Sequence, residues 1–174
     1  MSKQVFKLFP AWKDDQEENW LSEMAQDGWR LSSYRLGIYS FEPSSSIEEV
    51  YRLDYKGSSD RDLEDYKSLF EDAGWEHVTR FHGWHYFRKP LSDGQDTSVI
   101  YTDQASEGAK YKQLLTLLLP LFLLIIGSVT SLQAQPGYTF VSIIKWIFFS
   151  LIAFYIYAML RVYIKMKKVQ KTQL

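Results

Sequence analysis

Three histidines, His77, His82 and His85, lie within nine residues of one another and could be imagined as ligands of a zinc ion. A closed zinc site usually takes four ligands, often with cysteine among them. The chain has no cysteine, so a distant carboxylate would have to complete the set. His82 and His85 also flank Gly83, which predicts a turn. We therefore expect no metal site and no cofactor, and we expect surface or sheet-edge positions for the three histidines.

Two groups of four carboxylates are dense enough to suggest acid–base pairs. They are Asp14, Asp15, Glu17 and Glu18, and then Asp60, Asp62, Glu64 and Asp65. Both groups lie where a helix is predicted to begin. Carboxylates there cap free backbone N–H groups and meet the positive end of the helix dipole. Capping explains both groups without chemistry, so we expect no catalytic residue among them.

Other catalytic signatures are missing from the sequence. The serines at 44–46 lack the Gly-x-Ser-x-Gly context of a nucleophile, and no glycine-rich phosphate-binding motif occurs. The absence of cysteine also excludes thiolate chemistry and disulfides. We expect a protein that is not an enzyme.

Aromatic residues are frequent for a domain of this size. Five tryptophans precede residue 90: Trp12, Trp20, Trp29, Trp75 and Trp84. We expect most aromatic side chains in the core, with Trp29 and Trp75 beneath helices. A small two-layer fold does not hold them all, so the surplus could line an apolar ligand pocket or an interface. The sequence names no ligand-binding residue, and both roles stay open.

The charges divide the chain into two parts. All 21 acidic residues lie at or before Glu107, and residues 1–109 hold 12 of the 20 lysines and arginines, a net charge of −9. The remaining residues carry eight basic side chains and no acidic ones. An acidic domain repels phosphate, so we expect no nucleic-acid partner for it.

The basic part contains two long apolar segments, residues 114–132 and 140–164, joined by a short polar turn at 133–137. A bilayer core takes about 20 apolar residues per helix. The segments therefore predict a membrane hairpin. Lys110 and Lys112 precede it, and five basic residues from Arg161 to Lys171 follow it. By the positive-inside bias we expect a multi-pass protein of the cell membrane with both termini cytoplasmic.

The first hundred residues contain an internal repeat. A shift of 46 positions places Gly28 and Trp29 on Gly74 and Trp75, Gly37 on Gly83, and Phe41 on Phe87. With one residue less, residues 5–8 fall on residues 50–53. The domain is therefore predicted to be two copies of one unit.

Each copy predicts strand, helix, strand, strand. The expected strands are 3–9 and 49–55, and each helix (16–27 and a segment from about 63) ends at a glycine and is followed by a hairpin (29–41 and 75–88). Asp14 or Asp15, and Asp60 or Asp62, are the expected N-caps, and residues 97–102 predict a further strand. The fold class is α+β, an antiparallel sheet with two helices on one face.

We expect three regions along the chain. Residues 1–105 form the cytosolic domain, 106–112 a short linker or the beginning of the first apolar helix, and 113–174 the membrane hairpin with its basic tail.

The sequence resembles the bacterial domain-of-unknown-function family 2812 (DUF2812). The segments that carry the resemblance are residues 20–29, 39–41, 51–55, 66–75, 86–88 and 100–103. It covers roughly residues 3–105 and implies a genomic association with PadR-type transcription regulators, but no site residues. A topological analogy to the GyrI-like effector-binding domains of drug-sensing regulators favours a cleft between the two copies.

These observations support two functional hypotheses. The first is a membrane-anchored cytosolic sensing or regulatory module that binds a small apolar or cationic ligand or a protein partner. The alternative is an accessory subunit of a membrane protein complex such as a transporter.

Overall fold

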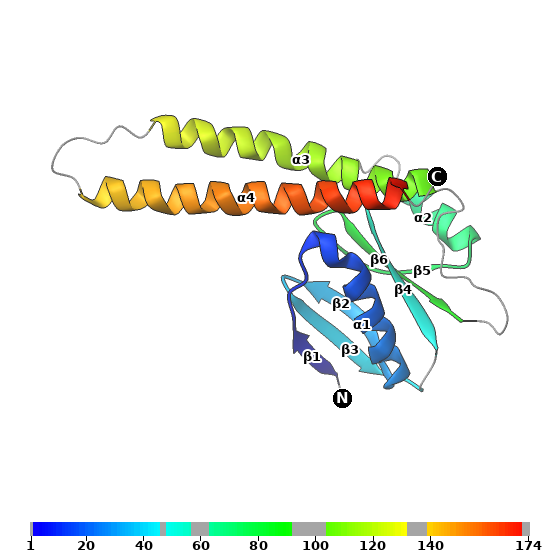
Figure 1. The fold of residues 1–174 in the computed structure, drawn as a ribbon. Helices are drawn as coiled ribbons and strands as arrows, with labels where there is room; N and C mark the ends of the chain where they lie inside the picture. Colours follow the sequence, from blue (N-terminus) through cyan, green and yellow to red (C-terminus); the bar gives the residue numbers. More distant parts are fainter. Residues whose placement is uncertain (1, 46–47, 57–62, 92–103, 132–138, 172–174) are drawn as a thin grey trace. The chain divides into compact units, whose positions relative to one another are not determined.

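The structure, a computed structural model of residues 1–174, describes residues 2–45, 48–56, 63–91, 104–131 and 139–171. The chain forms two compact units, Met1–Asp103 and Gln104–Leu174. The first contains all the strands and the shorter helices, and the second contains two long helices (Figure 1). The predicted α+β class is confirmed.

The first unit runs twice through strand, helix, strand, strand, as predicted. The elements are β1 (Lys3–Phe6), the short 3-10 helix η1 (Ala11–Lys13), α1 (Asp14–Gln26), β2 (Trp29–Arg35), β3 (Ile38–Pro43), β4 (Glu49–Tyr55), α2 (Leu63–Asp72), β5 (Glu76–Phe81) and β6 (Trp84–Pro90). The further strand expected at 97–102 lies outside the described residues.

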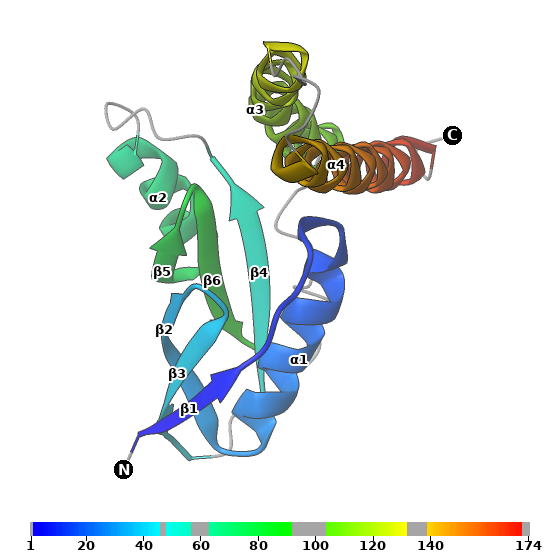
Figure 2. The ribbon, with the colours of Figure 1, turned by 90° about the vertical axis from the view of Figure 1, so that its left-hand side faces the viewer.

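The strands form two antiparallel three-stranded sheets, one from each repeat. Their strand orders are β1-β3-β2 and β4-β6-β5. The sheets meet where β2 lies beside β5, while α1 lies against β2 and β4 and α2 lies against β5 (Figure 2). The first helix therefore packs against both sheets, and among the described residues the second packs mainly against the sheet of its own repeat.

The two repeats share unusual backbone features at matched positions. Each has a two-residue hairpin turn, Leu36-Gly37 and His82-Gly83, in which all four residues have positive φ. This geometry suits the twist of paired strands, and it needs glycine or a tolerated left-handed residue. The helix-stopping glycines at 28 and 74 also have positive φ, so the predicted glycine stops and turns are confirmed.

Strand pairing corrects the predicted alignment of the first strand of each repeat. The Lys7 N–H donates to Gly37 O at 2.8 Å, and the Lys56 N–H donates to Gly83 O at 2.9 Å. Lys7 therefore matches Lys56, and the predicted match of residues 5–8 with 50–53 is wrong by four positions. A shift by an even number keeps every side chain on the same face of a strand, so apolar alternation alone does not fix the register.

The predicted N-caps of the first helix are also wrong. The 3-10 turn of η1 runs directly into α1, whose N-cap is Lys13 and makes no side-chain capping hydrogen bond. Asp14 and Asp15 lie instead inside the first helical turn, near the positive end of the dipole. In the second repeat the expected caps Asp60 and Asp62 lie outside the described residues.

The core is largely aromatic, as expected. One cluster is Leu21, Met24, Ala25, Leu31, Tyr39, Phe41, Tyr51, Leu53 and Tyr86, and another is Tyr66, Phe70, Trp75 and Phe87. Trp75 is buried, but Trp29 is only partly buried, with Lys3 Nζ 5.0 Å above its ring. Leu69 of α2 is 69% exposed.

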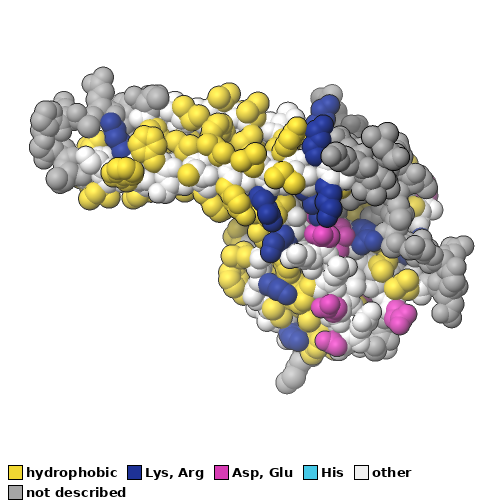
Figure 3. All heavy atoms as spheres, viewed as in Figure 1, with side chains coloured by type: hydrophobic (Ala, Val, Ile, Leu, Met, Phe, Trp, Pro, Cys, Tyr) yellow, Lys and Arg dark blue, Asp and Glu magenta, His cyan; other side chains and the backbone are white. Residues whose placement is uncertain are grey.

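The second unit consists of α3 (Gln104–Ser131) and α4 (Thr139–Lys171). Residues 106–112 are helical, which agrees with the expectation that they begin the first apolar helix rather than form a short linker. Lys110–Val129 and Phe140–Val169 are long and apolar enough to cross a membrane, and hydrophobic side chains run along both helices (Figure 3). The Tyr155 hydroxyl donates to Leu118 O at 2.7 Å, and its ring stacks on Phe122. The predicted turn at 133–137 lies outside the described residues.

Candidate ligand-binding site

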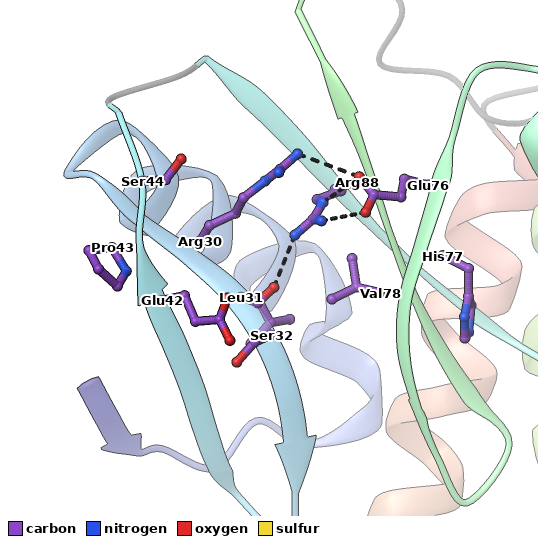
Figure 4. A pocket seen from close by; sticks show the side chains of 10 residues that line it. All are labelled: Arg30, Leu31, Ser32, Glu42, Pro43, Ser44, Glu76, His77, Val78 and Arg88. Carbon is purple, nitrogen blue, oxygen red and sulfur yellow. Dashed lines mark hydrogen bonds and ion pairs between the residues drawn. The ribbon is translucent and has the colours of Figure 1, made fainter. Parts of the chain in front are cut away.

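A cavity of about 360 Å³ lies between the two repeats, where β2 meets β5 (Figure 4). Its lining comes from β2, from the end of β3 and from the second sheet. The lining residues are Arg30, Leu31, Ser32, Glu42, Pro43, Ser44, Glu76, His77, Val78 and Arg88. Most are polar or charged, so this cavity differs from a predominantly apolar ligand pocket.

Irregularities in the strands shape the cavity. The pairing of β2 with β3 shifts between Leu31 and Ser33, and the pairing of β5 with β6 shifts between His77 and Thr79. A bulge leaves one residue without a paired partner and bends the strand. The bulged residues, Ser32 and Val78, are 46 positions apart, and both line the cavity. The same backbone irregularity in each repeat therefore helps to form the site.

Ion pairs hold the two repeats together beside the cavity. Arg30 binds both carboxylate oxygens of Glu49, at 2.6 and 3.2 Å, and approaches Glu76 at 3.4 Å. Arg88 also pairs with Glu76 and donates to Leu31 O at 3.1 Å. The Arg88 hydrogen bonds hold the pKa of Glu76 below its usual value. Because Glu49 is 1% exposed, this network is partly buried.

The charges of the junction are reversed between the repeats. Arg30 faces Glu42 across the first sheet, and Glu76 faces Arg88 at the matching place in the second. The Glu42 side chain makes no hydrogen bond or ion pair with another residue in the part of the chain that the structure describes. The two guanidinium groups and the two carboxylates that line the cavity balance in formal charge. Buried Glu49, bound to Arg30, adds a third carboxylate beside the lining.

One of the three histidines departs from its predicted surface or sheet-edge position. His85 is 2% exposed, so its predicted surface or edge position is wrong. Its Nδ1 lies 3.2 Å from Nε2 of the half-buried His77, which lines the cavity. Burial lowers the pKa of His77 and lowers the pKa of His85 to about 4. The pair is therefore neutral at pH 7, with one N–H donating to the other ring, while His82 lies in the hairpin turn.

Capping does not explain Glu17 and Glu18. Glu17 accepts hydrogen bonds from the hydroxyls of Tyr39 and Tyr86, at 2.6 and 2.7 Å. Burial raises the pKa of Glu17 despite those hydrogen bonds. Glu18 accepts from the Leu53 N–H at 2.8 Å and pairs with a side chain of β4 at 3.0 Å. Both carboxylates are buried structural groups, and they face the strands because they precede Leu21 at helical spacing.

The second carboxylate group is different. Glu64 and Asp65 lie in the first turn of α2 and are exposed, as expected for residues at a helix start. Within the described ranges, no three His, Asp, Glu or Cys side chains gather in a way that could hold a metal ion. The charged groups of the cavity can form ion pairs and hydrogen bonds with a polar ligand.

Sequence reasoning did not single out the four charged cavity residues. Arg30 and Glu76 occupy matched positions of the repeat, and so do Glu42 and Arg88. Opposite charges at matched positions favour pairing between copies, and this signal was visible in the 46-residue shift. The expected cleft between the copies has a counterpart in the cavity beside β2 and β5.

A family model described as a protein of unknown function, DUF2812, matches residues 13–123. The chain belongs to the DUF2812 family. The DUF2812 match includes every cavity-lining residue and continues to residue 123, inside α3. The match therefore begins after β1, ten residues later than predicted, and includes the beginning of the first apolar helix, beyond the predicted limit of 105. No curated protein and no solved structure gave a significant match to the chain.

Proposed function

We propose that this DUF2812 protein is a membrane-anchored sensing module that holds a small, polar, cationic ligand in the cavity between its two repeats. The observation that carries the proposal is the cavity itself. It is open to solvent, is formed by both repeats and has a carboxylate, Glu42, with no described partner. A cation there gains a charge-assisted hydrogen bond without breaking an existing ion pair.

The surrounding charges decide between ligand classes. An anionic ligand would have to displace Glu49 or Glu76 from Arg30 and Arg88, because those carboxylates already occupy the guanidinium groups. An apolar ligand would meet mainly polar side chains. A cationic ligand meets the Glu42 carboxylate and leaves the ion-pair network intact.

The two long helices support the anchoring part of the proposal. Both have the length and composition to cross a membrane. Basic residues flank only the ends that lead to the two termini, at Lys110 and Lys112 and from Arg161 onward. By the positive-inside bias the chain crosses the membrane twice, with the domain and both termini in the cytoplasm.

The proposal also covers the origin and role of the domain. Matched bulges, turns and glycine stops support descent from one duplicated unit. We propose a non-enzymatic role, because buried Glu17 is held by tyrosine hydroxyls and the cavity's carboxylates are held largely by arginines. The signalling partner would be a PadR-type regulator of the kind that the family resemblance implies.

Titration calorimetry on the full-length protein in detergent micelles tests the ligand class. The probes are small primary amines and guanidines, compared with carboxylates of the same size. We expect the amines or guanidines to bind and Glu42→Gln to weaken them about tenfold, the loss of one charge-assisted contact. Glu71→Gln, an exposed position on α2, is the matched control. Preferential binding of the carboxylates, or equal binding by the Glu42 variant, would contradict the proposal.

A second function is favoured by an apolar groove of about 530 Å³ between α3 and α4. Leu115, Leu119, Phe122, Ile156 and Met159 are among its lining residues. Such a groove fits an apolar helix, which supports an accessory subunit of a membrane complex. Replacing Met159 by Trp fills the groove, so a protein that co-purifies with the wild type should be lost. Retention of that protein would argue against this role.

A further inference from the structure

Four large apolar side chains are exposed together at one end of the first sheet. Phe6 and Leu8 are each 68% exposed, Leu36 is 66% exposed and Ile38 is 44% exposed. We name this group the apolar corner. Single exposed apolar residues are common on soluble proteins, but a contiguous group marks a contact site.

Strand pairing brings the apolar corner together. Phe6 lies opposite Ile38 in the pairing of β1 with β3. A Cβ atom at Gly37 would lie 2.6 Å from Leu8 Cδ2 and 3.1 Å from Phe6 Cε2, so both side chains lie over the hairpin turn. The corner is therefore a continuous surface rather than four scattered residues.

Leu36 is an unusual residue for its backbone position. It has φ of 49°, in a hairpin turn where Asn, Asp or Gly is preferred. The matched turn of the second repeat has the polar His82 in this conformation. A large, exposed apolar side chain at a strained position brings no local benefit, so its value lies in what it contacts.

The charged residues next to the apolar corner in the chain and in the strand register are basic, although the domain as a whole is acidic. Lys7 lies between Phe6 and Leu8 in the sequence, with its ammonium 4.3 Å from the centre of the Trp20 ring. Arg35 is exposed and lies opposite Ile38 in the pairing of β2 with β3. Apolar side chains with a basic rim complement the interface of a bilayer that contains anionic lipids.

We propose that the apolar corner inserts into the headgroup region of an anionic bilayer and so docks the domain on the membrane. The inference rests on the proposed anchoring by α3 and α4. Only residues 91–109 separate Pro90, the end of β6, from Lys110, where the first candidate span begins. Even fully extended, that segment spans about 65 Å, so the corner stays within reach of lipid. Four side chains also offer far less than the roughly 800 Å² per partner of a stable protein interface.

The absence of cysteine makes a direct test possible. Leu36→Cys in the full-length protein is labelled with an environment-sensitive fluorophore and reconstituted into phosphatidylcholine vesicles, with or without phosphatidylglycerol. Doxyl-labelled lipid should quench this probe at least about twofold more in the anionic vesicles. His82→Cys, the matched turn position, is the control and should show no such dependence. Replacing both Phe6 and Leu8 by Ser should abolish the quenching at Leu36.

A probe at Phe149→Cys in α4 separates the two proposals. If lipid quenches the Phe149 probe but not the Leu36 probe, the docking inference is overturned and the anchoring stands. If neither probe is quenched, the anchoring itself fails, and the docking inference fails with it. A Leu36 signal that changes with protein concentration and not with lipid would show that a second copy covers the corner, which also overturns the inference.

Discussion

At matched positions near the middle of their sheets, the first repeat has Tyr39 and the second has His85. Tyr39 donates to Glu17, which also accepts from Tyr86 of the other repeat. His85 instead contacts His77 of its own repeat. At this matched position the first repeat therefore contributes to a hydrogen-bond network that joins the two halves, whereas the second repeat has a contact within its own half.

The helices show the same contrast. On α1, Glu18 and Ser22 accept hydrogen bonds from the edge of β4, where the Leu53 N–H donates to Glu18 and the Tyr51 N–H donates to the Ser22 hydroxyl. They satisfy backbone groups that an edge strand would otherwise expose. The matched carboxylate of α2, Glu64, pairs with Lys67 on its own helix, and the Glu64 backbone carbonyl accepts a hydrogen bond from the Ser68 hydroxyl.

This difference shows how two repeats with similar backbones and different side chains make a domain with a cavity between them. The two repeats have the same backbone arrangement, with a bulge and a hairpin turn at matched positions of each. The side chains of the repeats differ. The helix α1 covers the junction between the repeats on one side, and the oppositely charged Arg30 and Glu76, at matched positions, form an ion pair across it beside the cavity. Perfectly equal copies would have lacked these complementary pairs.

The variant with the largest expected effect on stability tests whether α1 contributes more to the core than α2 does. Leu21 is fully buried, so Leu21→Ala should lower the free energy of unfolding by about 3 kcal/mol. The matched residue of α2 is the partly exposed Lys67. Lys67→Ala should change the free energy of unfolding by less than about 0.5 kcal/mol. Urea unfolding of the full-length protein in micelles, followed by tryptophan fluorescence, measures both. Equal losses would remove the distinction between the helices.

A second pair of variants compares the same residue type at matched positions. Glu18→Ala leaves the buried Leu53 N–H without its acceptor, so we expect a loss of about 2 kcal/mol in unfolding free energy. Glu64→Ala removes only an exposed ion pair within α2 and should cost less than about 0.5 kcal/mol. Circular dichroism during urea unfolding gives both values. A small effect at Glu18 would show that α1 does not protect the edge of β4.

The histidine pair predicts acid sensitivity in the second repeat. Burial lowers the pKa of His85 to about 4, below its ordinary value of about 6.5. Its contribution to stability is complete above the unfolded value and is lost as pH falls toward the folded one. His85→Phe should therefore reduce the loss of unfolding free energy between pH 7 and pH 5 by about 1 to 2 kcal/mol. An unchanged pH profile would contradict a buried neutral His85.

Glu17 predicts the opposite pH dependence in the first repeat, and the smallest effect, because two tyrosine hydroxyls offset part of its burial. The folded-state pKa of Glu17 is raised. Its contribution to stability is therefore complete below the ordinary carboxyl pKa and is lost as pH rises through the raised value. Glu17→Gln should gain stability relative to wild type as pH rises from 4 to 7. A constant difference across that range would show that Glu17 does not titrate as argued.

Much of the fold followed from sequence patterns with a direct physical cause. Gly37 and Gly83 predicted hairpin turns because those backbones need positive φ, and both turns are present. The apolar segments in α3 and α4 predicted long helices because no charged residue interrupts residues 114–132. Local conformation and composition were sufficient for these features.

The site needed tertiary information that local patterns do not contain. Burial of Glu17, Glu18 and His85 depends on which strands α1 and α2 meet, and polar residue type alone argued for the surface. The cavity depends on bulges at Ser32 and Val78, which the alternation of side chains does not reveal. The opposite charges of Arg30 and Glu76, at matched positions of the repeats, were the feature of the sequence that indicated the junction.

The most direct test of the central proposal is native mass spectrometry of the full-length protein released from its own membranes. Ser44→Trp places a large side chain in the cavity, and Ser33→Trp, at an exposed position of β2 that does not line it, is the control. We predict a small-molecule adduct on the wild type and the Ser33 variant that is missing from the Ser44 variant. An adduct that persists in the Ser44 variant, or none on any of the three proteins, would contradict a ligand site between the repeats.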